Sequence, residues 1–578
     1  MALAVLAPTL RPGYVLGYDM VFTPRQPLVP DAFGLGSAAP RAVPVDAILG
    51  LVTTVVPGQV VQKAILLALL VAAGWGAGAL VPTASRLVRC AAASAYVWNA
   101  FVAERLVLGH WSLLVAYAGL PWAVGLARGV RAGRPGSLAG LVALCALAAI
   151  TPGGGLLVLL TVAPVLAWPG RRSAARGLLG FLAGWVVVDA PWWLPAVLQG
   201  TSPAPDGGAV AGFAARADQP LGTLGSLLGL GGVWNAQVVP GSRGLLSTAV
   251  LTVLAVVAAA AGWRPLRERW GGAAPGLLVA AVLGVLLACA GTYAPGALGW
   301  VVAHVPGGGL LRDGQRFVAP WAVLLAVAAP LGAERLTRRA SDRAVRRAVV
   351  GVAVALPLLV MPDLAWGAAG RLVPVAYPGD WDRVRLLLSA DGRGGPSGDG
   401  DVAVLPWQAF RRFGWNGDRT VLDPAPRYLT RVTVVSRDLV VGTAIVPGDD
   451  PRSTAVGAAL ATGHPATATL PQLGIGWLLV ERGTPGPVDP GLLVGAALAY
   501  DGPDLRLYRL GPADGPGWPG TTPLVLTVDT VALAVAVGAG LAGWGARRRG
   551  RPSDPTGRRA AATVEAPGEP REGPWELS

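Results

Sequence analysis

Long runs of apolar residues, separated by short polar segments, extend over most of the chain. A helix needs about 20 apolar residues to cross the ~30 Å hydrocarbon layer of a membrane. By this measure the sequence predicts about 11–12 spans, so the expected fold class is mostly α, a polytopic membrane helical bundle. The predicted spans lie near residues 60–82, 88–104, 111–128, 137–151, 153–168, 177–199, 244–263, 273–293, 315–334, 345–362 and 522–545. The pair 137–151 and 153–168 is read as two helices.

Arginine clusters lie between these runs and predict the orientation of the spans. If every predicted span crosses the membrane, all of the clusters fall on one side, and the positive-inside rule makes that side the cytoplasm. Segments 11–59, 105–110, 200–243, 294–314 and 363–521 then face outward. The clusters are Arg86/Arg89, Arg128/Arg131/Arg134, Arg171/Arg172/Arg176, Arg264/Arg267/Arg269, Arg335 to Arg347 and Arg547/Arg548/Arg549.

The first and last segments of the chain differ from the predicted spans. Residues 2–10 (ALAVLAPTL) are too short to span, which leaves a truncated first helix or a segment at the membrane interface as alternatives. Residues 546–578 read as a disordered cytoplasmic tail, which is rich in Pro, Gly and Glu from Arg551 onward.

Residues 363–521 change character, because charged residues become more frequent and short β-like runs appear. Asp401–Leu405 and Gly474–Glu481 read as buried strands, and Leu505–Leu510 alternates like an edge strand. Two helices are expected at Trp381–Leu388 and Ala455–Thr462, and a loop at Asp391–Gly400. The expected domains are a membrane domain over 1–362, an extracytoplasmic α/β domain over 363–521, a final span over 522–545, and the tail.

Composition supports a multi-pass protein of the plasma membrane. Of the 578 residues, 53% are apolar and only 14% are charged, whereas soluble domains carry about 25% charged residues. The net charge of +14 comes from arginines beside the apolar runs, which suits membrane anchors and disfavours nucleic-acid binding. The three cysteines lie within apolar runs, and the three histidines follow no ligand spacing. A disulfide framework and a Cys- or His-based zinc site are therefore excluded.

Ionisable residues near the apolar layer are the candidates for chemistry, because burying one without a partner is costly. Asp19, among aromatic residues in the first outward loop, can act as a general base on a hydroxyl; the alternative is a solvated loop residue or a helix cap. Glu104 and His110 should lie at similar depth at the outer face, with Asn99 deeper. They could hold an acceptor sugar, a metal or an anionic head group, or form only a helix-end ion pair.

Two further positions are singled out. Arg312 and Arg316, with Gln315 between them, make a good phosphate clamp, because guanidinium binds phosphate oxygens in a bidentate manner; the alternative is a salt bridge to a neighbouring acid. Asp189 lies within the span 177–199, and an acid inside a membrane is a functional candidate by default, unless it pairs with an arginine.

Three short segments carry a resemblance to a known superfamily. The segments GYDMVFTP (17–24), NAFVAERLVLGHW (99–111) and LLRDGQRF (310–317) resemble the GT-C superfamily of integral-membrane glycosyltransferases. Within it, the chain looks like bacterial arabinofuranosyltransferases of cell-wall synthesis or YfhO-like membrane proteins. The likeness covers residues 11–362. The first loop departs from the usual acidic pair, since it has Asp19 with Asp31 twelve residues on.

The resemblance implies a function and roles for the candidate residues. The expected reaction is transfer of a sugar, with inversion, from a polyprenyl-phosphate donor to an envelope glycan or glycolipid on the outer face of the membrane. Asp19 would take the acceptor proton, and Arg312 and Arg316, with Gln315 and Arg105, would bind the donor phosphate. No cofactor is required, although a divalent cation (Mg or Mn) on Asp19 and Glu104 is an option. The alternatives are a flippase or transporter of lipid-linked sugar and a non-catalytic envelope-assembly scaffold.

Overall fold

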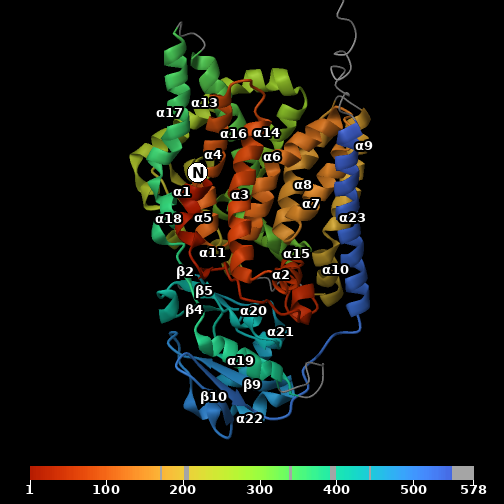
Figure 1. Ribbon diagram of the computed structural model, residues 1–578, viewed down its shortest axis with the longest axis vertical. Helices are drawn as coiled ribbons and strands as arrows, with labels where there is room; N and C mark the ends of the chain where they lie inside the picture. Colours follow the sequence, from red (N-terminus) through yellow and green to blue (C-terminus); the bar gives the residue numbers. More distant parts are fainter. Residues whose placement is uncertain (170–171, 201–206, 338–341, 391–398, 442–443, 550–578) are drawn as a thin grey trace, which may run out of the picture.

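Two regions follow one another along the long axis of the molecule (Figure 1): a helical bundle and a smaller region that contains a β-sheet. The computed structural model describes residues 1–169, 172–200, 207–337, 342–390, 399–441 and 444–549. The predicted tail beyond residue 549 and most of the predicted loop at 391–400 lie outside these residues.

The bundle is built from helices that the apolar runs predict. Its main helices are α3 (Gly58–Leu80), α4 (Arg86–Val97), α5 (Ala100–Val107), α6 (Trp111–Arg131), α7 (Ser137–Ala148), α8 (Pro152–Ala167), α9 (Arg172–Val188), α10 (Ala190–Gln199), α13 (Leu246–Trp270), α14 (Ala273–Tyr293), α16 (Ala319–Thr337), α17 (Arg343–Val360) and α23 (Thr522–Arg549). Within the described residues, six helices are long and apolar enough to cross a membrane, and two bent helix pairs pass the same test. The expected mostly helical membrane fold is confirmed, and segments 137–151 and 153–168 do form two helices, α7 and α8.

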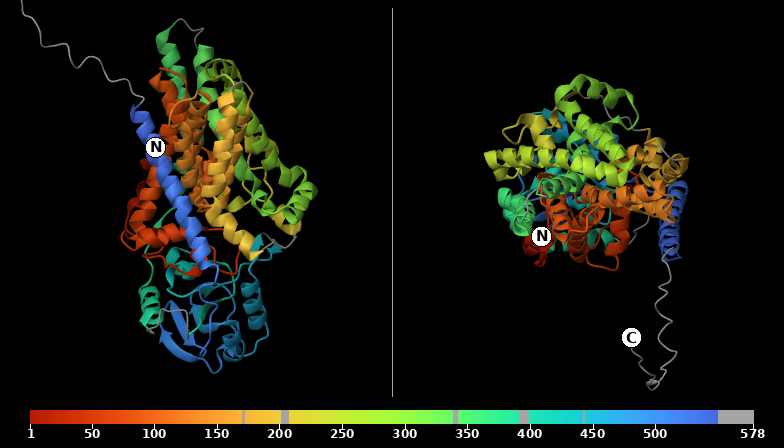
Figure 2. Two further views of the ribbon diagram at one scale, coloured as in Figure 1. Left: turned by 90° about the vertical axis from the view of Figure 1, so that its right-hand side faces the viewer. Right: turned by 90° about the horizontal axis from the view of Figure 1, so that it is seen from above.

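Burial separates central from peripheral helices. The apolar window that contains α16 is 72% buried, whereas that of α23 is only 11% buried. Figure 2 accordingly shows α23 on the outside of the bundle. An apolar helix with so little protein around it requires another apolar environment, which a bilayer provides.

Two predicted spans are broken, which corrects the continuous runs expected from hydropathy. The run 88–104 is divided at Asn99, whose Oδ1 accepts a hydrogen bond from Val102 N (3.0 Å) and so caps the start of α5. The run 177–199 bends by 60° between α9 and α10, at Asp189. Hydropathy cannot detect either break, because a polar side chain inside an apolar window lowers the average only slightly.

Several arginines gather at the end of the bundle opposite the sheet. Arg131 donates to Val165 O (3.0 Å) and Trp168 O (2.7 Å), and so satisfies carbonyls at the end of α8. Arg264 and Arg335 line one shared cavity between α13 and α16. The arginines at the end of α23 lie at this same end (Figure 1).

The sheet has five strands in the order β10-β11-β9-β3-β6, and β3 is parallel to both of its neighbours. The strands are β3 (Asp401–Leu405), β6 (Thr433–Val434), β9 (Ile475–Glu481), β10 (Ala497–Asp501) and β11 (Leu505–Arg509). Helices α19 (Gly379–Ala390) and α21 (Pro451–Ala461) cover the two predicted helical segments. The strands expected at 401–405 and 474–481 are therefore present.

One strand assignment is corrected. Leu505–Leu510 was expected at an edge, but β11 lies between β9 and β10. Leu505 and Leu507 are buried, while Arg506 and Arg509 are more exposed. Side chains on both faces of the sheet pack in hydrophobic clusters, with Leu505 and Leu507 on one side and Tyr508 on the other, so the alternation in the sequence did not mark an edge strand.

The first segment of the chain lies between the two regions. After α1 (Ala2–Leu6) and a short 3₁₀ turn, β1 (Tyr14–Val15) pairs with β2 (Pro374–Val375), which precedes the sheet. Further on, Tyr18 N donates to Thr420 O (2.7 Å) and Leu422 N donates to Tyr18 O (2.8 Å). Strand β5 (Thr420–Leu422), which forms a hairpin with β4 (Phe410–Arg412), therefore fixes the loop that carries Asp19.

Candidate functional site

The loop that carries Asp19 packs against the turn between α5 and α6. Asp19 N donates to Leu108 O (3.1 Å), and the next residue, Gly109, has φ +77°. A Cβ at Gly109 would overlap the backbone of Met20, so only glycine permits this approach. The close contact brings Asp19 Oδ2 to 2.8 Å from Nε2 of His110, the residue before α6.

The tautomer of His110 follows from its second neighbour. Arg105 Nη1 lies 2.7 Å from His110 Nδ1. A guanidinium can only donate, so Nδ1 accepts and the ring proton of the neutral imidazole is on Nε2. His110 therefore donates to the carboxylate of Asp19. Side-chain exposure increases along this series, from 0% at Arg105 to 20% at His110 and 45% at Asp19, so the acid is the member that a substrate can reach.

Arg105 is the centre of the site, and its side chain is fully buried. It donates to both carboxylate oxygens of Asp313 (2.5 and 2.9 Å) and, through Nε and Nη2, to Gln315 Oε1 (3.0 and 2.5 Å). With His110, these contacts use all five N–H groups of the guanidinium. Arg105, one of the residues expected to bind donor phosphate, thus has every donor engaged by its neighbours in this structure.

Asp313 is the partner that the sequence analysis missed, although it lies in the segment LLRDGQRF. Burial raises the pKa of this carboxyl, but the attraction and hydrogen bonds of Arg105 outweigh burial, and the net pKa is well below its usual value. Asp313 is thus a carboxylate held by Arg105. The sequence did not show that Arg105 is buried, and only that burial identifies the need for an acid beside it.

Arg316 and Arg312 have different surroundings. Arg316 Nε donates to Asp313 O (3.0 Å), while its two terminal nitrogens donate no hydrogen bond within the described part of the chain. Its Nη1 lies against Gly153 in the first turn of α8, where a Cβ would approach to 2.6 Å. Arg312 lies over the ring of Phe213, 5.5 Å from its centroid. Of the two expected phosphate ligands, Arg316 is the one joined to the Arg105 network.

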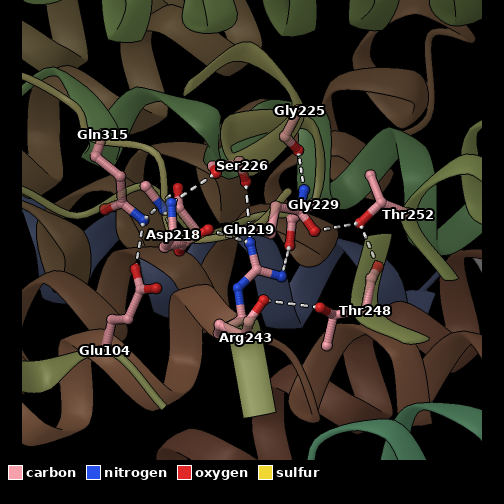
Figure 3. Close-up of polar contacts among 12 residues, drawn as sticks. Glu104, Asp218, Gln219, Gly225, Ser226, Gly229, Arg243, Thr248, Thr252 and Gln315 are labelled. Atoms are coloured by element: carbon pink, nitrogen blue, oxygen red, sulfur yellow. Dashed lines mark hydrogen bonds and ion pairs between the residues drawn. The ribbon is translucent and has the colours of Figure 1, made fainter. Parts of the chain in front are cut away.

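A buried polar layer continues inward from Gln315 (Figure 3). Gln315 Nε2 donates to Glu104 Oε2 (3.2 Å) and Gly231 O (3.4 Å). Next to it, Arg243 forms an ion pair with Asp218 (2.8 Å) and both side chains are at most 5% exposed. Glu104 is therefore turned into the protein and not toward an open surface, which corrects its expected role as an acceptor or metal ligand.

The donor groups present do not suit a divalent cation. Asp19 and Glu104, the expected ligands, are separated by His110 and Arg105, and the intervening charge is the cation of a guanidinium. Among the described residues no three His, Cys, Asp or Glu side chains come together in a metal-binding group.

The two remaining candidates have structural surroundings. Asn99 Nδ2 donates to Tyr96 O (2.8 Å) and Tyr117 Oη (3.0 Å), in addition to its capping of α5. Asp189 is fully buried and accepts from Trp192 Nε1 (2.9 Å). Its carboxylate packs directly against Gly155 of α8. Within the described residues no arginine forms an ion pair with Asp189, so the expected pairing is not observed there.

Comparison with known proteins identifies the fold. No family model and no curated protein matches the sequence. A cryo-EM structure of the arabinofuranosyltransferase AftD from Mycobacteria matches with a TM-score of 0.54 and 19% identity, over 89% of this chain and 39% of that one. A mutant of AftD matches with a TM-score of 0.52 and 21% identity, over 89% and 41%. The chain has a GT-C-like fold.

The GT-C-like fold covers most of this chain but spans less than half the length of AftD. The archaeal oligosaccharyltransferase AglB from Archaeoglobus fulgidus is also similar, with a TM-score of 0.40 and 10% identity over 83% of this chain and 64% of that one. That score is too low to support an argument about the site. The resemblance expected from the three sequence segments is confirmed at the level of the fold.

Proposed function

We propose that the chain is a membrane glycosyltransferase that moves a sugar from a polyprenyl-phosphate donor to an envelope glycan or glycolipid. The observation that carries this proposal is the continuous series Asp19–His110–Arg105–Asp313–Arg316. It links an exposed carboxylate to a guanidinium whose terminal nitrogens donate to no described residue. A base and an anion site connected in this way suit transfer from a phosphate leaving group.

The chemistry assigned to these residues is a single displacement. The acceptor hydroxyl gives its proton to Asp19 as its oxygen bonds to the anomeric carbon of the donor sugar. The bond from that carbon to the phosphate oxygen breaks, and its electron pair remains on the lipid phosphate. Arg316 binds the phosphate as its charge increases. One displacement inverts the configuration at the anomeric carbon.

The proposed orientation places the sheet region outside the cytoplasm of a cell with the chain in its plasma membrane. The arginines at the opposite end of the bundle would then face the cytoplasm, as the positive-inside rule requires. Arg316, at the sheet end, would meet the phosphate at the membrane surface while the lipid tail of the donor stays in the bilayer. Sugar and acceptor are left open by this proposal.

The test is Asp19→Asn in the full-length protein reconstituted in membranes. Asparagine retains an oxygen that accepts from His110 but cannot take a proton, so transfer should fall by about 10²–10⁴-fold. Asp418→Asn, at an exposed position in the sheet region, is the control and should transfer at the wild-type rate. Flipping of lipid-linked sugar that survives Asp19→Asn, in a protein without transferase activity, would favour the transporter. Absence of both activities from the wild-type protein would favour a scaffold.

A further inference from the structure

A second cluster of charged side chains lies away from the Arg105 network. A cavity of about 270 Å³ lies where the first outward loop of the bundle meets the sheet region. Its lining comes from Asp31 and Leu35 in the loop, Arg437 and Asp450 beyond strand β6, and Arg452 at the start of α21. Asp31 is the acid that follows Asp19 by twelve residues. The two acids of this loop therefore lie at different sites, Asp19 beside His110 and Asp31 at this cavity.

Arg437 lies between two carboxylates without hydrogen bonding to either. Its Nη2 is 3.9 Å from Asp31 Oδ2, and its Nε is 3.8 Å from Asp450 Oδ2. Both separations exceed hydrogen-bond distance. Within the described residues, the side chains of Asp31 and Arg437 make no hydrogen bond, whereas Arg452 is engaged by Asp401 at 2.7 Å. The cavity therefore presents open acceptors and open donors side by side.

The side chains of Asp31 and Arg437 are 37% and 35% exposed, so a ligand in the cavity can reach both. Burial raises the pKa of Asp31 although the nearby Arg437 acts to lower it. A partly desolvated carboxyl beside an unengaged guanidinium gains from a ligand that both donates and accepts.

The charges select one class of ligand. The lining contains two acids, Asp31 and Asp450, and two arginines, Arg437 and Arg452, of which Arg452 is already paired with Asp401 outside the lining. The arginines oppose a metal cation and the acids oppose an anion such as phosphate. A neutral polyol suits this lining, because a hydroxyl placed between a guanidinium and a carboxylate accepts from the first and donates to the second.

An aromatic side chain stands beside the cavity. Trp518 stands in the sequence between two lining residues, Gly517 and Pro519; it is not itself one of the lining residues and is 42% exposed. Its ring contacts that of Phe33, with centroids 5.8 Å apart, which holds it at the junction of the loop and the sheet region. An exposed indole provides a flat apolar surface with one donor at its edge, and the C–H face of a sugar ring packs on such a surface.

We propose that this cavity binds one sugar residue of a neutral glycan chain, with Asp31 and Arg437 on its hydroxyls and Trp518 on its ring. The volume is near the lower limit of ligand pockets (~300–1,000 Å³), which suits one residue of a longer chain. That this glycan is the acceptor rests on the proposed function; that the cavity binds a neutral glycan does not.

The test measures binding of neutral arabino-, manno- and gluco-hexasaccharides to the full-length protein in lipid nanodiscs by calorimetry. Wild type should bind at least one of them. Arg437→Gln and Trp518→Ala should each raise its Kd by about tenfold or more, the loss expected for a charged hydrogen bond or a buried aromatic contact. Arg506→Gln on β11 is the control and should bind like wild type. Inorganic phosphate should not compete.

The outcomes separate this site from the proposed reaction. Failure of every hexasaccharide to bind wild type, competition by phosphate, or unchanged binding in folded Arg437→Gln would overturn the glycan site. Folding of each variant is checked by its thermal transition, and Arg437→Lys provides a second variant that retains the charge.

If binding behaves as expected but Asp19→Asn still transfers sugar, the site stands and the assigned base fails. If transfer depends on Asp19 but Arg437→Gln keeps the wild-type KM for the acceptor, the reaction stands and the acceptor assignment fails.

Discussion

Each region of the molecule is organised around one fully buried arginine, and the two arginines differ in where their contacts lead. Arg105 in the bundle binds Asp313 and Gln315 and continues through His110 to the exposed Asp19. Arg411 in the sheet region forms ion pairs with Asp423 (2.7 Å) and with Glu481, and all three side chains are 0% exposed. Its remaining contact is to Gln408 O (2.6 Å).

The difference teaches how a buried charge can be recognised as structural or functional. Arg411 joins the β4–β5 hairpin to β9, and every charge in that cluster is enclosed. The cluster therefore fixes one arrangement of strands and has no outlet to a substrate. The Arg105 network has the same chemistry at its centre but ends on a carboxylate that is 45% exposed. The exposure of Asp19 at the end of the network identifies the site, whereas burial of the central Arg105 does not.

The largest effect is expected for Arg411→Met. Removing this guanidinium leaves two carboxyl groups buried without their partner, and breaking a buried pair in this way costs about 3–5 kcal/mol. The free energy of unfolding, followed by tryptophan fluorescence during denaturation in detergent, should fall by that amount. Arg412→Met on the same strand, whose side chain is exposed, should leave it within about 0.5 kcal/mol. Wild-type stability of Arg411→Met would show that the cluster is not what joins the hairpin to β9.

A smaller effect, and a different one, is expected for Arg105→Lys. The ammonium keeps the charge but offers three donors in place of five, so Asp313, Gln315 and His110 cannot all be held. We expect kcat for sugar transfer to fall about 10²-fold from misplacement of the reacting groups. Arg371→Lys at an exposed position of the same end serves as the matched control. A lysine variant with the kcat of wild type would remove Arg105 from the site and make it equivalent to Arg411.

The smallest effect is a spectroscopic one. In protein labelled with ¹⁵N-histidine, His110 should have a proton on Nε2 and none on Nδ1, because Arg105 donates to Nδ1. The other two histidines, His304 and His464, are exposed, and replacing both by glutamine leaves one imidazole in the spectrum. A protonated Nδ1 would contradict the series from Arg105 to Asp19.

Much of the bundle could be predicted from the sequence because lipid permits few alternatives. A run of apolar residues has to be helical in a membrane, and α14 occupies the predicted residues 273–293. The breaks at Asn99 and Asp189 were missed because they depend on one side chain each. In the sheet region, β3 and β9 were found from continuous apolar runs, whereas the neighbours of β11 depend on the rest of the sheet.

The sequence predicted most residues of the candidate site but not the contacts between them. The structure brings Asp19, His110, Arg105, Gln315 and Arg316 into one network. The resemblance to membrane glycosyltransferases grouped Asp19 with Arg105, Gln315 and Arg316, but the contacts of these residues were not predictable. Asp313 holds Arg105, and Asp218 with Arg243 comes from a segment expected to be an outward loop. A charged residue in a loop is expected to be solvated unless the fold of the loop is known. The sequence therefore did not indicate that Asp218 and Arg243 form a buried ion pair.

The hydrogen bonds between Tyr18 and strand β5 have a consequence for synthesis of the protein. The loop that holds Asp19 leaves the ribosome before residues 420–422, which fix it and follow some four hundred residues later. The bundle can enter the membrane in the order of its helices, but the acid receives its final support only when the sheet region has folded against it. In the proposed reaction, the base of a nascent chain inserted in the bilayer therefore lacks this support until residues 420–422 have been made.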